Sequence, residues 1–367
     1  MTDWLCLYRK SNYDDADYFC ETLKKASINF GLNVSDPEWA EMGDRDKVEE
    51  WTSTVKEYMN NHNYKFVVFL LDKNDNIYKY LKIHSLCDIG YVSQVVKVKS
   101  LSKNAMNVCS KILLQINSKL SGVSYIPKLE DNIKNKQLII IGVHSSNIKN
   151  NRIGVAMVST INPSFTNFYN KELIFNGEQM ENNQKYFSEF IAESLNEYKK
   201  LNNKLPKGIV IYRKGVYFNE KKYHKDEIKS IKNIFTQNNL LYYYILANTQ
   251  TSIKFFEKNN NQYSNPEGGL LLLDGVTNKN FFEFYIQPQQ VKIGCANPSF
   301  FHVVDGDLDI PEMIPKLTFD LCHLYSNWQG AIRIPHVLKL AEKLSKMTSD
   351  YTLLELNNNL KLSQSYL

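Results

Sequence analysis

The stretch Tyr64-Lys-Phe-Val-Val-Phe-Leu-Leu-Asp72 is a continuous apolar run that ends in the turn-prone residues 73–76. Such a run is typical of a strand that is buried on both faces of a parallel sheet. Ahead of it, a short apolar segment at residues 4–8 predicts another buried strand, and helical spacing of apolar residues predicts helices at residues 13–26 and 44–60. The alternation of strands and helices predicts an α/β fold for this part of the chain.

A polar stretch at residues 127–136 separates this region from the rest of the chain and is expected to be a linker. Beyond it, apolar runs predict strands at residues 137–143, 154–161, 208–212, 240–247, 270–273, 281–286 and 300–304. Helical spacing predicts helices at residues 184–199, 225–238, 314–328 and 337–347. We therefore expect two domains, residues 1–126 and 127–367, with a mixed α/β fold in the second.

The composition is that of an ordinary globular protein, since 43% of the 367 residues are hydrophobic and 23% are charged. The sequence has no run of about 18 apolar residues, which a membrane-spanning helix needs. It begins without a basic flank followed by an apolar segment, so no secretory signal is expected. The six cysteines include no C-x-x-C pair, which favours an intracellular location, in cytoplasm or nucleus, over a disulfide framework or a zinc site. A net charge of +5 is compatible with a polyanionic partner without demonstrating one.

One helix, expected at residues 106–120, carries two distinct stripes of side chains. Its apolar stripe is formed by Cys109, Ile112, Leu113, Ile116 and Leu120. On another face, Lys111, Gln115 and Lys119 recur every four residues. A solvated surface and a binding surface would both account for this polar stripe.

Several strings of the sequence resemble one protein family. Leu321-Cys-His-Leu-Tyr-Ser-Asn-Trp328 and Ala341-Glu-Lys-Leu344 resemble the C-terminal signature of PIWI-clade Argonaute proteins. Pro206-Lys-Gly-Ile-Val-Ile-Tyr-Arg-Lys-Gly-Val216 resembles the second active-site strand of that clade. Ser93-Gln-Val-Val96 and the helix at residues 111–120 are similar to its MID domain. The resemblance follows one collinear order over nearly the whole chain.

This resemblance implies a Rossmann-like MID domain at residues 1–126 and an RNase H-like PIWI domain at residues 127–367. Full-length Argonautes carry N-terminal and PAZ domains ahead of this region, so we expect a shortened protein that lacks both. The expected partners are a small guide RNA, held by its 5′-phosphate, and a complementary target RNA. The implied role is RNA-guided gene silencing, in which another protein supplies the PAZ and N-terminal functions or the silencing effect and no membrane takes part.

The 5′-phosphate pocket of the PIWI clade matches five positions of this sequence, namely Tyr78, Lys82, Gln94, Gln115 and Lys119. A phosphate needs several hydrogen-bond donors and positive charge at one point, and an aromatic ring can stack on the first base. The alternative is that the lysines are surface residues and the tyrosine a packing residue. In this clade the terminal carboxylate joins the pocket, which implies roles for Leu367 and for a bridging Mg²⁺ ion. The alternative for the terminus is a frayed tail.

Active PIWI domains hold two metal ions with an Asp, a Glu, a second Asp and a fourth Asp or His, because Mg²⁺ prefers carboxylate oxygens. The matching positions carry His144, Lys214 and Glu342, and the glutamate is Glu181 or, in a shifted loop alignment, Glu178. An ammonium group about 4 Å from a dication costs several kcal/mol. We therefore expect no metal in this site and no guide-directed cleavage. Lys214 is expected to pair with Glu342 or else to contact the nucleic-acid backbone.

Lys292, Arg333 and Lys339 lie in the stretch where PIWI domains contact the guide backbone, although ordinary surface residues would look the same. Two other functions stay open. One is a protein-interaction scaffold that no longer binds RNA, which the retention of all five pocket residues disfavours. The other is a nuclease with a rearranged metal site that uses His144 and the remaining carboxylates, which Lys214 disfavours.

Overall fold

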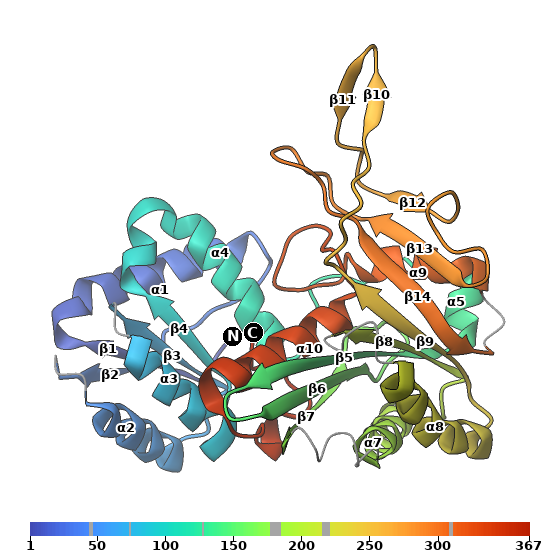
Figure 1. The fold of residues 1–367 in the computed structure, drawn as a ribbon. Coiled ribbons are helices and arrows are strands. Elements are labelled where there is room, and N and C mark those ends of the chain that lie inside the picture. The colour runs from blue at the N-terminus through green and yellow to red at the C-terminus, as the bar shows by residue number, and fades with distance from the viewer. Residues whose placement is uncertain (44–46, 73–74, 127, 177–184, 215–220, 308–310) are drawn as a thin grey trace. The chain divides into compact units, whose positions relative to one another are not determined.

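The computed structural model describes residues 1–43, 47–72, 75–126, 128–176, 185–214, 221–307 and 311–367 (Figure 1). The chain forms two compact units, Met1–Ser124 together with Asp350–Leu367, and Tyr125–Ser349. The division after Ser124 is close to the expected boundary after residue 126. The C-terminal residues differ from the expected assignment to the second domain because they pack within the first unit, where the backbone N–H of Asn357 donates to the carbonyl of Leu86 (2.8 Å).

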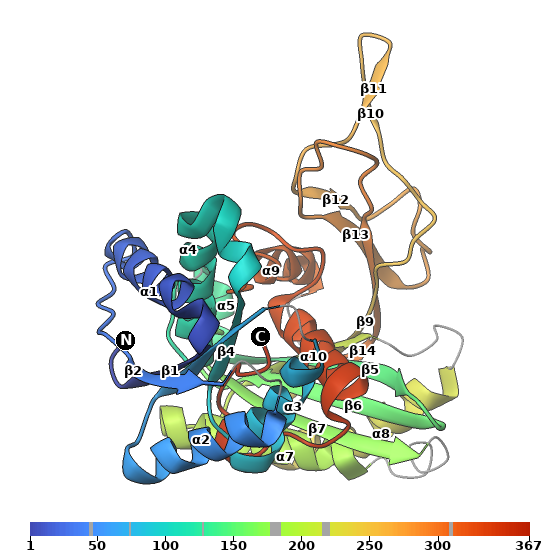
Figure 2. The same cartoon turned by 90° about the vertical axis from the view of Figure 1, so that its left-hand side faces the viewer.

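The first unit is built on a parallel four-stranded sheet with the order β2-β1-β3-β4. Its strands are β1 (Trp4–Arg9), β2 (Glu38–Met42), β3 (Phe66–Leu71) and β4 (Ser93–Lys97). Its main helices are α1 (Tyr13–Ile28), α2 (Val48–Asn61), α3 (Asp75–Ile83) and α4 (Leu101–Lys119). Helices α1 and α4 pack together on one face of the sheet and α2 and α3 lie on the other (Figures 1 and 2). The expected strand at residues 64–72 is β3, and all six of its residues are buried because helices cover both faces.

The second unit contains an eight-stranded sheet with the order β12-β13-β14-β9-β8-β5-β6-β7. Its strands are β5 (Leu138–Ile148), β6 (Arg152–Thr160), β7 (Phe168–Asn176), β8 (Gly208–Lys214), β9 (Leu241–Asn248), β12 (Leu270–Leu272), β13 (Phe282–Gln287) and β14 (Ser299–Gly306). Strands β5, β8 and β9 run parallel and the other pairs run antiparallel. An exposed hairpin of β10 (Glu257–Asn259) and β11 (Gln262–Ser264) projects from this unit (Figure 1).

Helices cover both faces of this second sheet (Figure 1). Helices α7 (Lys185–Asn202) and α8 (Lys221–Asn238) enclose an apolar core against one face. Helix α10 (His336–Met347) lies on the other face against β5 and β6. It approaches β5 so closely that a Cβ atom at Gly142 would lie 2.3 Å from the backbone carbon of Val337. Glycine at this position therefore allows α10 to pack closely against the sheet.

A buried ion pair joins β8 to α8. The guanidinium of Arg213 donates from Nε and Nη2 to the two carboxylate oxygens of Glu227, at 3.2 and 3.1 Å. The hydroxyl of Tyr186 donates to the same carboxylate (3.0 Å), as does that of Tyr244. Both charged side chains are fully buried. The ion pair therefore depends on these hydrogen bonds to offset the loss of hydration.

Two expectations for this unit are wrong in detail. The expected linker at residues 127–136 contains the short helix α5 (Asp131–Lys136). The helix expected at residues 314–328 is α9 (Ile314–Leu321), which ends seven residues early. Cys322 caps it, and its backbone N–H donates to carbonyls of the last turn, after which the chain turns away.

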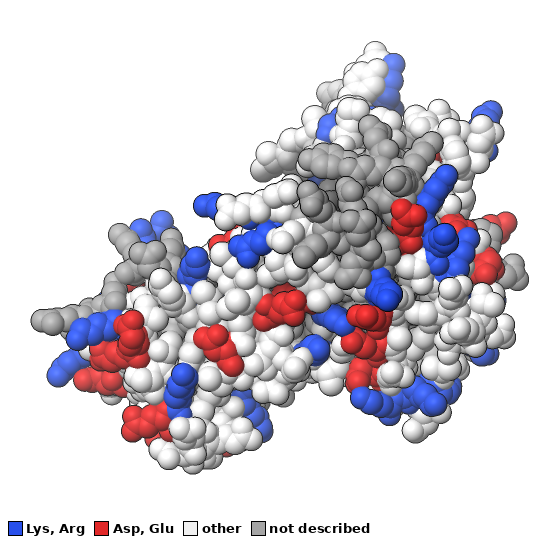
Figure 3. Space-filling view, turned by 60° about the horizontal axis from the view of Figure 1, so that its bottom comes forward, with Lys and Arg blue, Asp and Glu red and all other residues white. Residues whose placement is uncertain are grey.

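None of the helices in the described ranges combines the length and the apolar character that crossing a membrane requires. All six cysteines lie in the described part of the chain, and no disulfide joins any two of them. The face drawn in Figure 3 carries Lys and Arg next to Asp and Glu, so the net charge does not by itself mark a binding surface.

Candidate functional site

Two lysines of the first unit are buried near the C-terminal ends of two helices. Lys82 near the end of α3 is 2% exposed, and Lys119 at the end of α4 is 1% exposed. The ammonium of Lys119 donates to the carbonyl of Ser93 (2.8 Å) and to Oε1 of Gln94 (2.9 Å). The ammonium of Lys82 lies 3.5 Å from the hydroxyl of Ser93. The first two residues of β4 thus bring both ammonium groups to one place. We call Lys82 and Lys119 the lysine pair.

The described part of the chain places no counter-charge beside the lysine pair. Burial lowers the pKa of Lys82 to about 8, and burial together with the charge of Lys82 lowers the pKa of Lys119. Among the described residues, no carboxylate acts on either ammonium group. Two buried positive charges without a counter-charge cost several kcal/mol each, and a bound anion would offset that cost.

Tyr78 lies beside the lysine pair. Its ring centroid is 6.0 Å from Nζ of Lys82 and 5.4 Å from the ring of Tyr351, which it meets edge to face. Burial raises the pKa of Tyr78 to about 12, so its hydroxyl stays neutral. Gln115 is half-buried one turn before Lys119 on α4. The structure therefore brings Tyr78, Lys82, Gln94 and Lys119 together and places Gln115 on the helix face of Lys119.

The C-terminal residues pack against the same end of α4. The hydroxyl of Ser363 donates to the carbonyl of Lys119 (2.5 Å), and that of Ser121 donates to the carbonyl of Leu362 (3.0 Å). Tyr366 is 1% exposed and Leu367 is half-buried. These contacts describe a packed segment and not a frayed tail, so the alternative stated for the terminus is wrong.

Three of the positions that match the active site of PIWI domains meet in the second unit. His144 on β5 and Lys214 on β8 are direct neighbours in the parallel register. Helix α10 brings Glu342 to them, and Lys214 Nζ lies 3.3 Å from its carboxylate. The expected ion pair between Lys214 and Glu342 is thus confirmed. Lys339 and Lys346 on α10 also pair with this carboxylate, at 3.4 and 2.9 Å.

Electrostatics at this second site follow from burial and the surplus of lysines. Burial raises the pKa of Glu342, but Lys214, Lys346 and Lys339 together lower it to about 2. Burial lowers the pKa of His144 to about 3, so its imidazole is neutral, and its Nδ1 lies 2.7 Å from the hydroxyl of Ser345. The site therefore offers one carboxylate that is already engaged by three ammonium groups.

A metal-ligand set is not found here within the ranges that the structure describes, where no three His, Cys, Asp or Glu side chains could share a metal ion. Glu178 and Glu181 lie outside the described residues. The described donors therefore fit an ion-pair cluster better than a divalent cation, because ammonium groups repel a dication.

The three residues expected along a guide backbone have different surroundings. Nη2 of Arg333 donates to the carbonyl of Thr249 (2.5 Å). Lys339 pairs with Glu342, and Lys292 is exposed in the loop after β13. A hollow of about 200 Å³ beside Arg333 is lined also by Gln287, Pro288, Gln289, Val291, Cys295 and Asn297.

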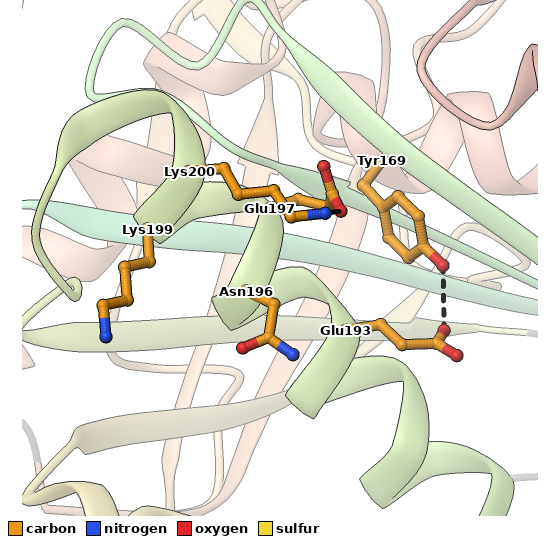
Figure 4. Close-up of a pocket in the computed structure, with 6 residues that line it drawn as sticks. All are labelled: Tyr169, Glu193, Asn196, Glu197, Lys199 and Lys200. Atoms are coloured by element: carbon orange, nitrogen blue, oxygen red, sulfur yellow. Dashed lines mark hydrogen bonds and ion pairs between the residues drawn. The ribbon is translucent and has the colours of Figure 1, made fainter.

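Another hollow of about 500 Å³ lies between α7 and β7 (Figure 4). Most of its charged groups are paired, since the hydroxyl of Tyr169 donates to Glu193 (2.8 Å) and Lys200 pairs with Glu197 (2.6 Å). We therefore do not assign it a ligand.

The sequence did not predict several residues that shape these sites. Ser93 contacts both ammonium groups of the lysine pair, and its place directly before Gln94 is the signal that could have found it. Lys346 follows Glu342 by four residues on a helix, which is the spacing of an ion pair. No sequence signal indicates the contacts of Ser345 with His144 or of Tyr351 with Tyr78.

Comparisons with known proteins agree on one family. The family model described as "Piwi domain" matches residues 65–352. Protein argonaute-3 of Drosophila melanogaster is 27% identical over 355 residues, which cover 94% of this chain and 40% of that protein. The crystal structure of Drosophila Piwi aligns with a TM-score of 0.89 and 24% identity, over 99% of this chain and 50% of that one. The crystal structure of Kluyveromyces polysporus Argonaute with a guide RNA aligns with a TM-score of 0.85 and 16% identity, over 99% of this chain and 51% of that one.

The chain therefore spans about 40% of the length of its curated relative. The matched structures show that its mixed α/β architecture is that of the MID and PIWI lobe, in which the Piwi domain is RNase H-like. Because the family model covers well over half of the sequence, this chain belongs to the Piwi-domain family of Argonaute and Piwi proteins.

Proposed function

We propose that this protein binds a small guide RNA by its 5′-phosphate and does not cleave the RNA that pairs with the guide. The observation that carries the proposal is the lysine pair, in which Lys82 and Lys119 are buried without a carboxylate among the described residues. A terminal phosphate supplies the missing negative charge and accepts charge-assisted hydrogen bonds from both ammonium groups. The resemblance to a guide-binding Argonaute fold supports this choice of anion.

Neighbouring side chains suit the rest of a 5′ nucleotide. The half-buried ring of Tyr78 next to Lys82 provides an aromatic surface on which the first base can stack. The amide of Gln94 holds the ammonium of Lys119 in place, which fixes the donor before the ligand arrives. Preorganised donors of this kind raise affinity because less ordering is needed on binding.

The Mg²⁺ ion implied by the resemblance would be held by the terminal carboxylate of Leu367 together with the 5′-phosphate, and the described side chains of the lysine pair would not serve as its ligands. The two ammonium groups repel a dication, and Oε1 of Gln94 already accepts from Lys119. The proposal therefore rests on the ammonium groups alone.

The absence of cleavage is proposed from the chemistry of the second site. Hydrolysis of a phosphodiester by two divalent ions needs several carboxylates to hold them. Here Lys214 and Glu342 form an ion pair, and His144 is a neutral side chain next to it. Two like unit charges about 4 Å apart repel each other by about 4 kcal/mol at an effective dielectric constant of 20. The repulsion between the ammonium of Lys214 and a dication at that distance would be larger.

The role proposed for the whole protein is RNA-guided gene silencing. Base pairing between the guide and a complementary RNA would select the target, and a partner protein would supply the silencing effect. This follows from the family and from the proposed loss of cleavage.

A binding experiment with matched RNAs tests the first part of the proposal. The affinity of the whole chain is measured for one short RNA that carries either a 5′-phosphate or a 5′-hydroxyl. We expect the 5′-phosphate form to bind at least about tenfold more tightly, since each charge-assisted hydrogen bond contributes about 1.5–3 kcal/mol. Changing Lys82 and Lys119 to Met should abolish this preference, and Lys111→Met, an exposed position on the same helix α4, should preserve it.

Equal affinity for the two RNAs in the unchanged protein would contradict the proposal and would favour the scaffold function. Cleavage is tested separately by incubating the guide-loaded protein with complementary RNA in Mg²⁺ or Mn²⁺. No product is expected, and guide-dependent cutting would show that the second site works as a nuclease.

A further inference from the structure

Positive charge gathers around a single carboxylate in the second unit. Lys214, Lys339 and Lys346 each place an ammonium group within 3.4 Å of the carboxylate of Glu342. Arg333 and Lys343 lie within electrostatic reach of the same carboxylate. Burial lowers the pKa of both groups, and the charge of Glu342 only partly opposes this lowering. We call Lys214, Lys339 and Lys346 the lysine cluster.

Glu342 accepts only some of the hydrogen bonds that the lysine cluster can donate. Each ammonium group has three N–H donors, and among the described residues each donates a single hydrogen bond to Glu342. Two donors on each lysine are thus left for another acceptor. The three lysine side chains are 21, 29 and 55% exposed, so a ligand in solvent can reach them.

Neutral hydroxyl groups lie at the edge of the lysine cluster. Ser345 and Ser146 are 2.9 Å apart at their hydroxyl oxygens, and Nδ1 of His144 lies 2.7 Å from that of Ser345. None of these groups adds negative charge, because burial keeps His144 neutral. The described part of the site therefore has more positive than negative charge, and its ammonium groups have N–H donors that no described residue accepts.

We propose that the lysine cluster is a binding site for a phosphodiester group of an RNA strand and that it works without a divalent cation. The proposal rests on the proposed RNA-binding function and assigns a second, separate contact to it. Ammonium groups can hold a phosphate by charge and hydrogen bonds, but they cannot polarise it or activate water as a metal ion does. The cluster would therefore hold the strand without cutting it.

A salt titration in EDTA tests this proposal on the whole chain. The probe is a single-stranded RNA with a 5′-hydroxyl, so that the lysine pair of the first unit has no terminal phosphate to bind. Replacing the three lysines with Lys214→Met, Lys339→Gln and Lys346→Gln should weaken binding about tenfold. The slope of log K against log salt should become shallower by about 0.7, the contribution of one lost phosphate contact on a single strand.

Two further variants keep the result interpretable. Glu342→Gln removes the one carboxylate that pairs with the lysine cluster among the described residues, and it should tighten binding severalfold, a change in the opposite direction that impaired folding would not produce. Lys316→Gln is the matched control and should leave the affinity unchanged. Lys316 pairs with Asp320, four residues away on its helix, at 3.0 Å, and Lys346 pairs with Glu342 at the same spacing.

The proposal is overturned if the triple variant binds with the affinity and salt slope of the unchanged protein, if Glu342→Gln does not tighten binding, or if binding needs Mg²⁺. The two sites fail independently. Equal affinity of the unchanged protein for 5′-phosphate and 5′-hydroxyl RNA would contradict the guide proposal, and the lysine cluster would still be supported if its triple variant weakens the binding of both RNAs.

Discussion

The ammonium of Lys82 gives the RNA-free protein a specific pH dependence. Burial lowers its pKa from 10.5 to about 8. Between about pH 8 and 10.5 the unfolded chain holds this proton and the folded chain does not, so the free energy of unfolding should rise with pH in that window. Below it both states are protonated, and the full penalty, on the order of 3 kcal/mol, is present.

Urea denaturation of the RNA-free protein from pH 7 to pH 10 measures this effect. Lys82→Met should raise the free energy of unfolding at pH 7 and flatten its rise towards pH 10. If the variant and the unchanged protein show parallel pH profiles, the ammonium is not buried as described.

Glu342 predicts a pH dependence at the acidic end. Burial alone would raise its pKa, but the adjacent ammonium groups lower it to about 2 from 4.5. Its contribution to stability is complete above about pH 4.5 and is lost as the pH falls towards 2. Glu342→Gln should therefore lower the free energy of unfolding at pH 7 by about 2 kcal/mol, less than the pKa shift alone implies because water partly screens the cluster.

The difference between Glu342→Gln and the unchanged protein should shrink when both are denatured at pH 3. Asp320→Asn breaks an ion pair with the exposed Lys316 and serves as the comparison, with an expected loss below about 1 kcal/mol. Equal losses from the two substitutions would contradict the special role of the cluster.

At the scale of elements, the ion pair between Arg213 and Glu227 should determine how firmly α8 is attached to β8. Both side chains are fully buried, so removing one leaves a buried charge without its partner. Arg213→Met or Glu227→Leu alone should lower the free energy of unfolding by about 3–5 kcal/mol, and the double substitution should cost less than either.

Chemical denaturation of the single and double variants measures this coupling. The control is Lys232→Gln on the same helix α8, which breaks the more exposed pair with Asp305 on β14 and should cost less than about 1 kcal/mol. Additive losses in the double variant would show that the two charges do not depend on each other.

Elements with strong local patterns were predictable from the sequence. The all-apolar β3 and the amphipathic α1 match their expected ranges closely, because a buried strand and a helix packed on one face each leave a clear pattern. β7 was not predicted, since its buried positions include Asn170 and Glu172, whose polar groups are satisfied by tertiary contacts. The early end of α9 at Leu321 was also missed, because apolar and aromatic residues recur up to Trp328 and no Gly or Pro marks the end.

The sites were predictable to different degrees. The meeting of Lys214 with Glu342 followed from the resemblance and from charge, and the structure shows it. That Lys119 is buried could not be read from its helix, where a polar residue every four positions resembles a solvated face. Its burial depends on β4 and on the C-terminal residues, which are far away in the sequence.

At the scale of the whole molecule, the C-terminal segment predicts a link between stability and RNA binding. Tyr366 is almost fully buried, and the neighbouring Ser363 contacts the carbonyl of Lys119. Tyr366→Ala should lower the free energy of unfolding by about 3–5 kcal/mol, as for other large buried side chains. It should also weaken the preference for 5′-phosphorylated RNA, because it loosens the end of α4.

Thermal unfolding and the RNA comparison described above check both effects. Leu362→Ala, at a side chain that is half exposed, is the control and should leave the preference unchanged. A destabilised Tyr366→Ala protein that keeps the full preference would separate the segment from the phosphate site.

The packing of Asp350–Leu367 onto Met1–Ser124 also bears on protein synthesis. A ribosome must translate residues 125–349 before the segment that completes the first unit can emerge. At about 5–20 residues per second, this interval is roughly 10–45 s. During that interval the lysine pair, the proposed phosphate site, would lack the segment that packs against the end of α4. Guide loading would therefore begin only as translation of Asp350–Leu367 ends.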